Sequence, residues 1–296
     1  MWGHGQERQR KYGKGQVLSG MDMPQALNIL QLPADVAQLP EQVLYTHRST
    51  ADGQIYFVTN QSDQNITLSP AFRVQGKQPE WWDAVTGETR DLKEFTPQPA
   101  HTVVPLTLAP YQSGFVVFRK KAAATGKGVN FPGAITLTQL QGPWKVSFDA
   151  AKRGPAQPVI FDQLTDWSTH TNEQIRNYSG TAVYEITFKA DELPAESTPY
   201  LDLGAVSVMA DVTLNGVPLG NVWTAPYRVN VKQALKKEEN KLTVTVVNTW
   251  VNRLIGDSKL PAAERKTWSN VNPYTPKDAY QASGLMGPVK LIAVKY

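Results

Sequence analysis

The stretch at residues 211–257, DVTLNGVPLGNVWTAPYRVNVKQALKKEENKLTVTVVNTWVNRLIGD, decides the fold of this chain. Apolar and polar residues alternate at its start, and Asn215-Gly216 interrupts the alternation. Asn-Gly is the strongest short signal for a β-hairpin, because both central residues of a type I′ turn need a positive φ. Alternation returns at residues 242–246, as expected of a strand with one buried face. The stretch therefore predicts antiparallel β-structure.

The same pattern continues along the rest of the chain. Residues 54–60, QIYFVTN, predict a strand, and PEWWDAVTGETRDL at residues 79–92 predicts a hairpin with Thr86-Gly87 at its turn. The best helical candidate is short, at residues 23–30, with Pro24 in its first turn. Short strands separated by frequent turn signals are typical of β-sandwiches, so we expect an all-β protein.

Composition limits the classes of function. The chain has 296 residues, enough for two domains, and its 41% hydrophobic content is sufficient for packed cores. It has no cysteine, which excludes disulfides and thiol nucleophiles. The net charge of +4 is scattered rather than gathered in a basic stripe, so we expect no nucleic-acid partner. No apolar run is long enough to cross a membrane, so we expect no membrane partner.

Two groups of motifs carry a resemblance to known enzymes. VTLNGVPLG at residues 212–220 and ENKLTVTVVN at residues 239–248 resemble the sugar-binding jelly-roll domain of family 2-type glycoside hydrolases. NTWVNRLIGDSKLP at residues 248–261 and SGLMGPVKLIAV at residues 283–294 resemble the C-terminal part of family 106 α-L-rhamnosidases. The resemblance implies two β-sandwich domains, the second of them a galactose-binding-like jelly roll.

The resemblance and the composition together predict a division of the chain. Residues 1–25, with KYGKGQVLSG, are expected to be the remnant of a preceding amidotransferase-like domain. Residues 26–120 are expected to form an accessory β-sandwich. Small residues, glycines and a final proline predict a linker at residues 121–132. Residues 133–296 are expected to form the jelly roll, with its first and last strands paired.

Catalysis by this chain itself is not expected. Glycoside hydrolysis needs two carboxyl groups roughly 5–10 Å apart, and in the resembling enzymes these lie on a (β/α)₈ barrel that is absent from this sequence. No HExxH or GxSxG motif occurs either. We therefore expect a noncatalytic portion of a glycoside hydrolase that binds carbohydrate and supports the catalytic barrel. A purely structural module and a glycosidase with an unrecognised site are the alternatives.

The best candidates for sugar recognition follow residues 242–246. An aromatic ring, an amide, a guanidinium and a carboxylate occur within eight residues there, and a planar guanidinium suits neighbouring hydroxyls. An internal ion pair between Arg253 and Asp257 that pins this loop is the competing interpretation. Two aromatic residues after the hairpin, Trp223 and Tyr227, are further candidates, although core packing would suit them equally well. Trp268 is the last candidate. It belongs to a second rim of the expected site, formed by Arg265, Trp268, Asn270, Asn272 and Tyr274. The full set is Trp223, Tyr227, Trp250, Asn252, Arg253, Asp257 and Trp268.

The expected partners follow from the resemblance. They are a carbohydrate, rhamnose-containing if the family is a guide, and the catalytic barrel of the parent enzyme. No cofactor or metal ligand is predicted, although a structural calcium ion is compatible with a jelly roll. The first fifteen residues, MWGHGQERQRKYGKG, lack the apolar segment of a signal peptide. We expect the parent to be periplasmic or secreted, with its signal outside this chain.

Overall fold

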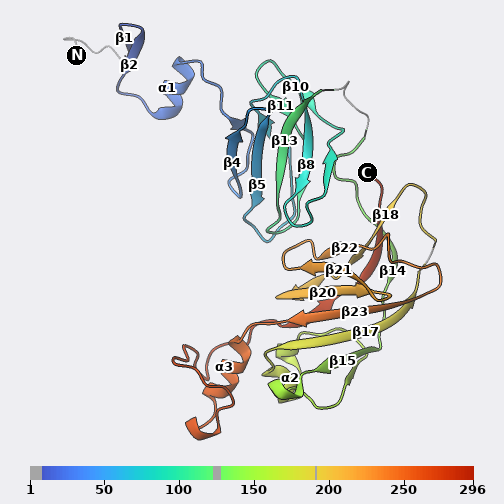
Figure 1. Ribbon diagram of the computed structural model, residues 1–296. Helices are drawn as coiled ribbons and strands as arrows, with labels where there is room; N and C mark the ends of the chain where they lie inside the picture. The colour runs from blue at the N-terminus through green and yellow to red at the C-terminus, as the bar shows by residue number, and fades with distance from the viewer. Residues whose placement is uncertain (1–8, 123–127, 191) are drawn as a thin grey trace. The chain divides into compact units, whose positions relative to one another are not determined.

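The computed structural model describes residues 9–122, 128–190 and 192–296, and strands dominate these ranges (Figure 1). Contacts divide the chain into two compact units, which we call the first unit, mostly residues before Phe131, and the second unit, mainly Phe131–Tyr296. The predicted linker at residues 121–132 includes residues 123–127, which lie outside the described residues. Each unit has its own sheets, as expected of two β-sandwich domains.

The first unit is built from antiparallel sheets. One sheet has five strands, in the order β4 (Val43–Ser49), β5 (Gln54–Asn60), β13 (Ser113–Lys121), β8 (Lys77–Asp83) and β9 (Thr89–Asp91). A second sheet has four, in the order β10 (Thr96–Pro97), β11 (Thr102–Val103), β7 (Ala71–Phe72) and β3 (Val36–Ala37). A shorter pair joins β12 (Leu106–Leu108) to β6 (Ile66–Leu68).

The core of the first unit explains why its strands alternate. Tyr56 and Val58 of β5 are fully buried, whereas Phe57 between them is only partly buried. The ring of Tyr56 packs edge-on against Phe72 of the four-stranded sheet, with 4.8 Å between centroids, and Phe72 also contacts Phe118 of β13. Side chains from both sheets therefore meet in one core, which is the defining feature of a sandwich. The hairpin predicted around Thr86-Gly87 forms between β8 and β9.

The N-terminal part of the described chain contains a hairpin and a short helix. The hairpin pairs β1 (Gln9–Tyr12) with β2 (Gly15–Leu18), and α1 (Met23–Ile29) follows. The side chain of Asp22 accepts a hydrogen bond from the backbone N–H of Gln25, and the Gln25 side chain accepts one from the backbone of Asp22. This capping box, with Pro24 in the first turn, satisfies the free N–H groups that begin a helix. The predicted helix is confirmed.

The second unit also consists mainly of strands. Its four-stranded sheet has the order β14 (Ile135–Gln139), β25 (Lys290–Val294), β18 (Thr198–Asp202) and β22 (Arg228–Asn230). Its six-stranded sheet has the order β16 (Val159–Phe161), β15 (Trp144–Phe148), β17 (Thr181–Lys189), β23 (Glu239–Val247), β20 (Met209–Leu214) and β21 (Val217–Val222). A small pair joins β19 (Ala205–Ser207) to β24 (Gly284–Gly287). Helices are short: η1 (Ala150–Lys152), η2 (Trp167–Thr169), α2 (Glu173–Arg176), α3 (Val251–Ser258) and η3 (Ala262–Glu264).

A large hydrophobic core lies between the two main sheets of the second unit. It joins residues of the six-stranded sheet, such as Tyr184 and Val244, to residues of the four-stranded sheet, such as Leu201 and Leu291. Tyr184 is completely buried, and its hydroxyl oxygen accepts a hydrogen bond from Trp167 Nε1 at 2.6 Å. Burial raises the pKa of Tyr184, because the phenolate would lose its hydration there. The first strand of this unit, β14, pairs with the last, β25, as predicted for a jelly roll.

The Asn-Gly hairpin of the deciding stretch forms as predicted. Asn215 and Gly216 have φ values of 55° and 82°, the positive values that a type I′ turn requires. The Asn215 side chain is used inside the fold, because its Nδ2 donates to the Ala234 carbonyl and its Oδ1 accepts from the backbone N–H of Lys241. Asn215 therefore serves the turn and the start of β23.

The segment after β23 differs from the loop that the sequence suggested. It forms a helix, α3, directly after the side chain of Asn248 has bonded the backbone of Tyr178 and Gly180. Burial of Ile255 and Gly256 on one face of α3 stabilises this helix, although no side chain caps its N-terminus. Tertiary packing has overridden a sequence that lacks helix-start signals.

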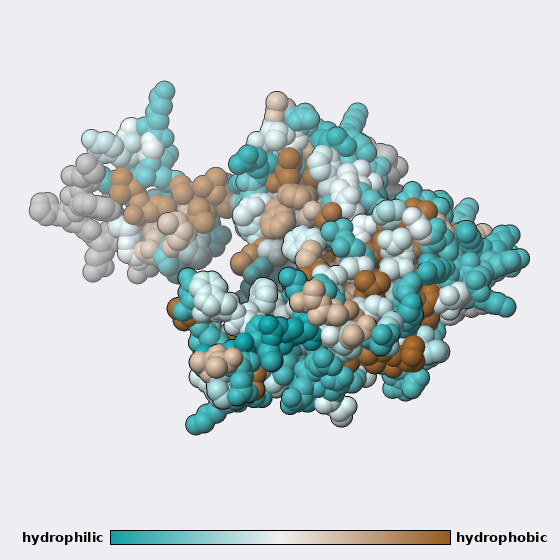
Figure 2. Space-filling view, turned by 60° about the horizontal axis from the view of Figure 1, so that its bottom comes forward, coloured by the Kyte–Doolittle hydropathy of each residue, from teal (hydrophilic) through white to brown (hydrophobic). Residues whose placement is uncertain are grey.

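Figure 2 shows that most of the visible surface is hydrophilic and that apolar residues gather in separate patches on it. Within the described ranges, no helix has the length and apolar character needed to cross a membrane.

Candidate functional site

The candidate site lies beside α3, at an excursion of the second unit that we call the arm. The arm comprises residues 259–283, between α3 and β24, and contains η3 as its element of regular structure. In Figure 1 this part of the chain, drawn in orange near α3, extends away from the sheets of its unit. Its position depends on side chains that tie it back to α3 and to the sandwich.

Asn252 is the main tie between α3 and the arm. Its Nδ2 donates to the Gln281 carbonyl at 2.7 Å and to Ser283 Oγ at 2.9 Å, and its Oδ1 accepts from the Gln281 N–H at 2.8 Å. Only 1% of Asn252 is exposed. The amide that the sequence offered as a sugar ligand thus holds the end of the arm in place.

Arg253 is buried on the other side of α3. Its Nη2 donates to the Lys152 carbonyl at 3.3 Å, which joins α3 to η1. Burial lowers the pKa of Arg253, and the nearby negative charge of Asp257 partly opposes that change. Within the described residues, however, no Arg253 nitrogen lies within ion-pairing distance of Asp257. The ion pair that the sequence left as an alternative is therefore not formed.

A pocket of about 280 Å³ opens between α3 and the arm. It brings together two predicted candidates, Asp257 and Trp268, and two residues of the predicted second rim, Arg265 and Asn272. Its full lining is Leu254, Asp257, Ala262, Arg265, Thr267, Trp268, Ser269 and Asn272. One residue of the first predicted group and three of the second rim therefore line the same pocket.

Asp257 is the buried carboxylate of this pocket. It is 2% exposed, and its Oδ2 accepts a hydrogen bond from the backbone N–H of Thr267 at 2.7 Å. Within the described chain, its other oxygen, Oδ1, has neither a hydrogen-bond donor nor an ion-pair partner. Because Oδ1 is not fully enclosed by the protein, water or a donor group of a ligand can reach it.

Trp268 and Arg265 provide the exposed side of the pocket. Trp268 is 86% exposed, so nearly the whole indole ring is open to solvent. The Arg265 side chain is also exposed, and its Nε donates weakly to the Leu260 carbonyl at 3.4 Å. A flat apolar ring beside free guanidinium donors can contact both the C–H face and the hydroxyl groups of a sugar.

The remaining polar side chains of the pocket support the arm. Asn272 Nδ2 donates to the Leu254 carbonyl at 2.9 Å, and Asn272 Oδ1 accepts from the Tyr274 N–H. Ser269 Oγ donates to the Val271 carbonyl at 2.7 Å. These bonds shape the pocket wall, and they leave Asp257 Oδ1 as its strongest acceptor for a ligand.

The other predicted candidates lie outside the pocket lining. Trp250 directly precedes α3 and is 57% exposed, while Trp223 follows β21 and is 59% exposed. Tyr227 instead packs partly buried against the core of the second unit, and burial raises its pKa. For these aromatic side chains, the structure favours core packing for Tyr227 and leaves Trp223 and Trp250 open to solvent.

The carboxylates of the second unit do not form a hydrolytic pair in this pocket. Asp257 is the one acidic residue in the lining, whereas glycoside hydrolysis uses two. Asp166 caps η2 and accepts the Ser283 N–H. Glu185 lies between Lys145 and Lys241, and the hydrogen bond from Lys145, followed by that from Lys241, lowers its pKa. These two carboxylates have structural partners.

The structure also shows pocket residues that the sequence did not indicate. Leu254, Ala262, Thr267 and Ser269 lack a motif of their own, and proximity to Trp268 in the chain was the available signal for two of them. In the described part of the chain, no three His, Asp or Glu side chains gather closely enough to suggest a metal site.

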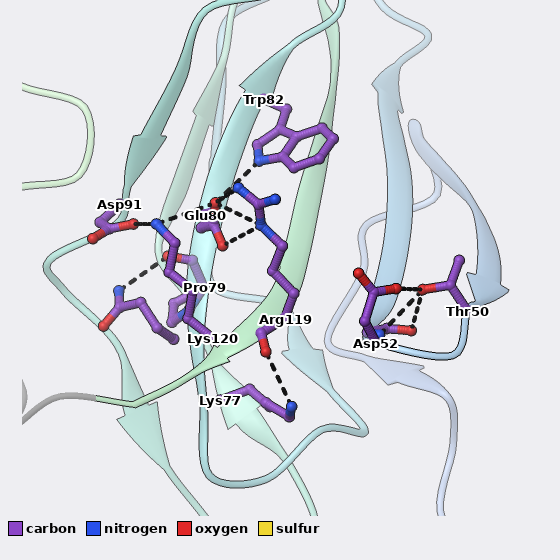
Figure 3. Close-up of polar contacts among 11 residues, drawn as sticks. Thr50, Asp52, Lys77, Pro79, Glu80, Trp82, Asp91, Arg119 and Lys120 are labelled. Atoms are coloured by element: carbon purple, nitrogen blue, oxygen red, sulfur yellow. Dashed lines mark hydrogen bonds and ion pairs between the residues drawn. The ribbon is translucent and has the colours of Figure 1, made fainter.

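A second polar cluster lies on the five-stranded sheet of the first unit (Figure 3). Arg119 Nε and Nη2 donate to the carboxylate of Glu80, Trp82 Nε1 donates to it at 3.3 Å, and Lys120 lies 3.5 Å away. The Arg119 guanidinium also lies over the Trp82 ring, 4.9 Å from its centroid. Each of these polar groups has a partner within the cluster. We therefore interpret the cluster as a stabilising network.

Comparisons with known proteins agree with this architecture. Residues 160–283 match the family model described as glycosyl hydrolase 2 galactose-binding domain-like. Residues 1–96 match the family 106 model described as α-L-rhamnosidase. The second unit is thus a galactose-binding-like β-sandwich, and the chain resembles part of a family 106 α-L-rhamnosidase-like glycoside hydrolase.

Individual relatives support the same resemblance. A solved structure of a rhamnosidase from Novosphingobium sp. PP1Y matches 98% of this chain with a TM-score of 0.87 and 33% identity. A putative β-glucuronidase of Formosa agariphila is 38% identical over 197 residues, which is 58% of this chain. The chain spans 28% of the first relative and 16% of the second. The activities of those longer proteins are therefore not transferred to it directly.

Proposed function

We propose that this chain is the noncatalytic, carbohydrate-binding portion of an α-L-rhamnosidase-like glycoside hydrolase. The observation that carries the proposal is the pocket between α3 and the arm, where an exposed Trp268 ring lies beside a single buried carboxylate. An aromatic face with a few polar groups suits sugar recognition, whereas one carboxylate is insufficient for the usual hydrolytic mechanism.

The proposal includes a supporting role next to a catalytic barrel elsewhere in the parent protein. The similarity to a rhamnosidase more than three times as long, of which this chain covers 28%, supports that placement. The carbohydrate would be a rhamnose-containing glycan, and the parent would act in the periplasm or outside the cell. These points rest on the family resemblance.

Two assays on the same preparation test the proposal. Calorimetric titration with rhamnose-containing oligosaccharides should show binding, and an aryl α-L-rhamnoside should release no aryl group above the rate in buffer. Enzymatic release of the aryl group would overturn the noncatalytic assignment. Absence of binding to every oligosaccharide would instead favour a purely structural module.

A further inference from the structure

The unpaired oxygen of Asp257 defines what the pocket can bind. Asp257 is 2% exposed, and among the residues that the structure describes its Oδ2 has a partner, the N–H of Thr267, whereas its Oδ1 has none. Because Asp257 lines the pocket, a ligand there is in reach of the carboxylate. A buried carboxylate with a free acceptor site favours a ligand that donates a hydrogen bond, and it disfavours a second negative charge.

The other polar groups of the pocket lining further restrict the kinds of ligand that can bind. Ser269 and Asn272 are occupied by bonds to the arm and to α3. Among the described lining residues, this leaves the Arg265 guanidinium as the donor and the Thr267 hydroxyl as a second small polar group. An acceptor and a donor on one pocket wall match two neighbouring hydroxyl groups, one donating and one accepting. The exposed Trp268 ring offers a flat surface for the C–H groups of the same molecule.

We infer that the pocket binds one uncharged glycosyl residue through two adjacent hydroxyl groups. One hydroxyl donates to Asp257 Oδ1, its neighbour accepts from Arg265, and the sugar ring lies against Trp268. The pocket volume of about 280 Å³ accommodates one pyranose ring and excludes a longer glycan segment from full burial. This inference rests on the proposed carbohydrate-binding function and specifies its location and its ligand.

To test this inference, the whole chain is titrated with methyl glycosides, and binding is measured by calorimetry or ligand-observed NMR. The panel contains methyl α-L-rhamnopyranoside, methyl α-D-galactopyranoside and methyl α-D-galacturonide, of which the last two differ only at C6, where a hydroxymethyl group is replaced by a carboxylate. We expect at least one neutral glycoside to bind and the galacturonide to bind more weakly than its neutral counterpart. Equal or tighter binding of the galacturonide would overturn the requirement for an uncharged ligand.

Two variants locate the site. Trp268→Ala removes an exposed ring without touching the core and should weaken binding about tenfold. Asp257→Asn turns the free acceptor position into an amide and should weaken binding by about tenfold or more. The matched controls, Val271→Ala and Asp278→Asn, change exposed arm residues outside the pocket lining and should bind as the unchanged chain does.

The outcomes separate this inference from the proposed function. Binding of oligosaccharides that survives both Trp268→Ala and Asp257→Asn would place the sugar site elsewhere and leave the proposed function standing. Binding of oligosaccharides without binding of any single glycoside would also overturn the one-residue pocket. Because Trp268→Ala removes only an exposed side chain, it gives a clear answer even if Asp257→Asn lowers stability, which circular dichroism melting would show.

Discussion

Glu80 shows how a single residue in the first unit is held in its ionised form. Glu80 is 1% exposed in the fold, and burial alone would raise its pKa. Hydrogen bonds from Arg119 and Trp82 and the charge of Lys120 outweigh burial, so the pKa of Glu80 falls below its usual value of 4.5. A carboxylate stabilised in this way contributes to folding only while it is ionised.

The pH dependence of stability follows from that shift. Because the folded pKa lies below the unfolded value of 4.5, the contribution of Glu80 is fully present above that pH and is lost as pH falls through the folded pKa. Glu80→Gln should lower the free energy of unfolding of the first unit by about 2 kcal/mol at pH 7. Urea unfolding monitored at pH 7, 5 and 3 should show the difference shrinking towards pH 3. A difference that stays constant over this range would contradict the role of the charge.

At the scale of elements, side-chain hydrogen bonds attach the arm to α3. Asn252 alone makes three hydrogen bonds to residues near the end of the arm, while the arm itself exposes Trp268 and Val271. A segment with few buried apolar contacts opens more readily than the sheets that carry it. The position of the candidate pocket therefore depends on the amide of Asn252.

Asn252→Ala should loosen the arm. The substitution leaves the Gln281 N–H without its acceptor and removes one donor each from the Gln281 carbonyl and the Ser283 hydroxyl, which costs about 1–3 kcal/mol. Hydrogen exchange should quicken at amides of residues 259–283 and change less in β17 and β23. Asn270→Ala is the control, because that side chain is exposed on the same arm. Unchanged exchange in the arm of Asn252→Ala would show that other contacts hold it.

At the scale of the whole molecule, the two units have separate hydrophobic cores. Among the described residues, the members of the large core cluster run from Leu140 to Leu291 and all belong to the second unit. The first unit buries Tyr56, Phe72 and Phe118 against one another instead. A substitution that destabilises one core should therefore lower the stability mainly of the unit that contains this core.

Val244→Ala tests this separation. Val244 is fully buried in the central strand β23, and removing its methyl groups should cost about 2 to 3 kcal/mol of unfolding free energy in the second unit. Hydrogen exchange should show weaker protection across β17, β20 and β23 and unchanged protection in β5 and β13. An equal loss of protection in both units would mean that they unfold as one.

Local pattern and resemblance were enough to predict the β-class, the strand at residues 54–60, the capped helix and the Asn215-Gly216 turn. Each of these depends on neighbouring residues, because alternation, a capping box and a positive-φ pair act within a few positions of the chain. The pairing of the first and last strands of the second unit followed from the jelly-roll resemblance.

Only the tertiary structure decided the roles of the candidate site residues, because burial and partnership depend on segments far apart in sequence. Nothing near Asn252 in the chain shows that its amide bonds Gln281 and Ser283, 29 and 31 positions away. Arg253 and Asp257 are four positions apart, but this spacing does not predict their partners. Arg253 donates to the Lys152 carbonyl, whereas Asp257 accepts from Thr267 and lines a pocket with Trp268. By itself the sequence determined which polar and aromatic groups are present, and the packing of α3 against the arm determined which of them remain free to bind a ligand.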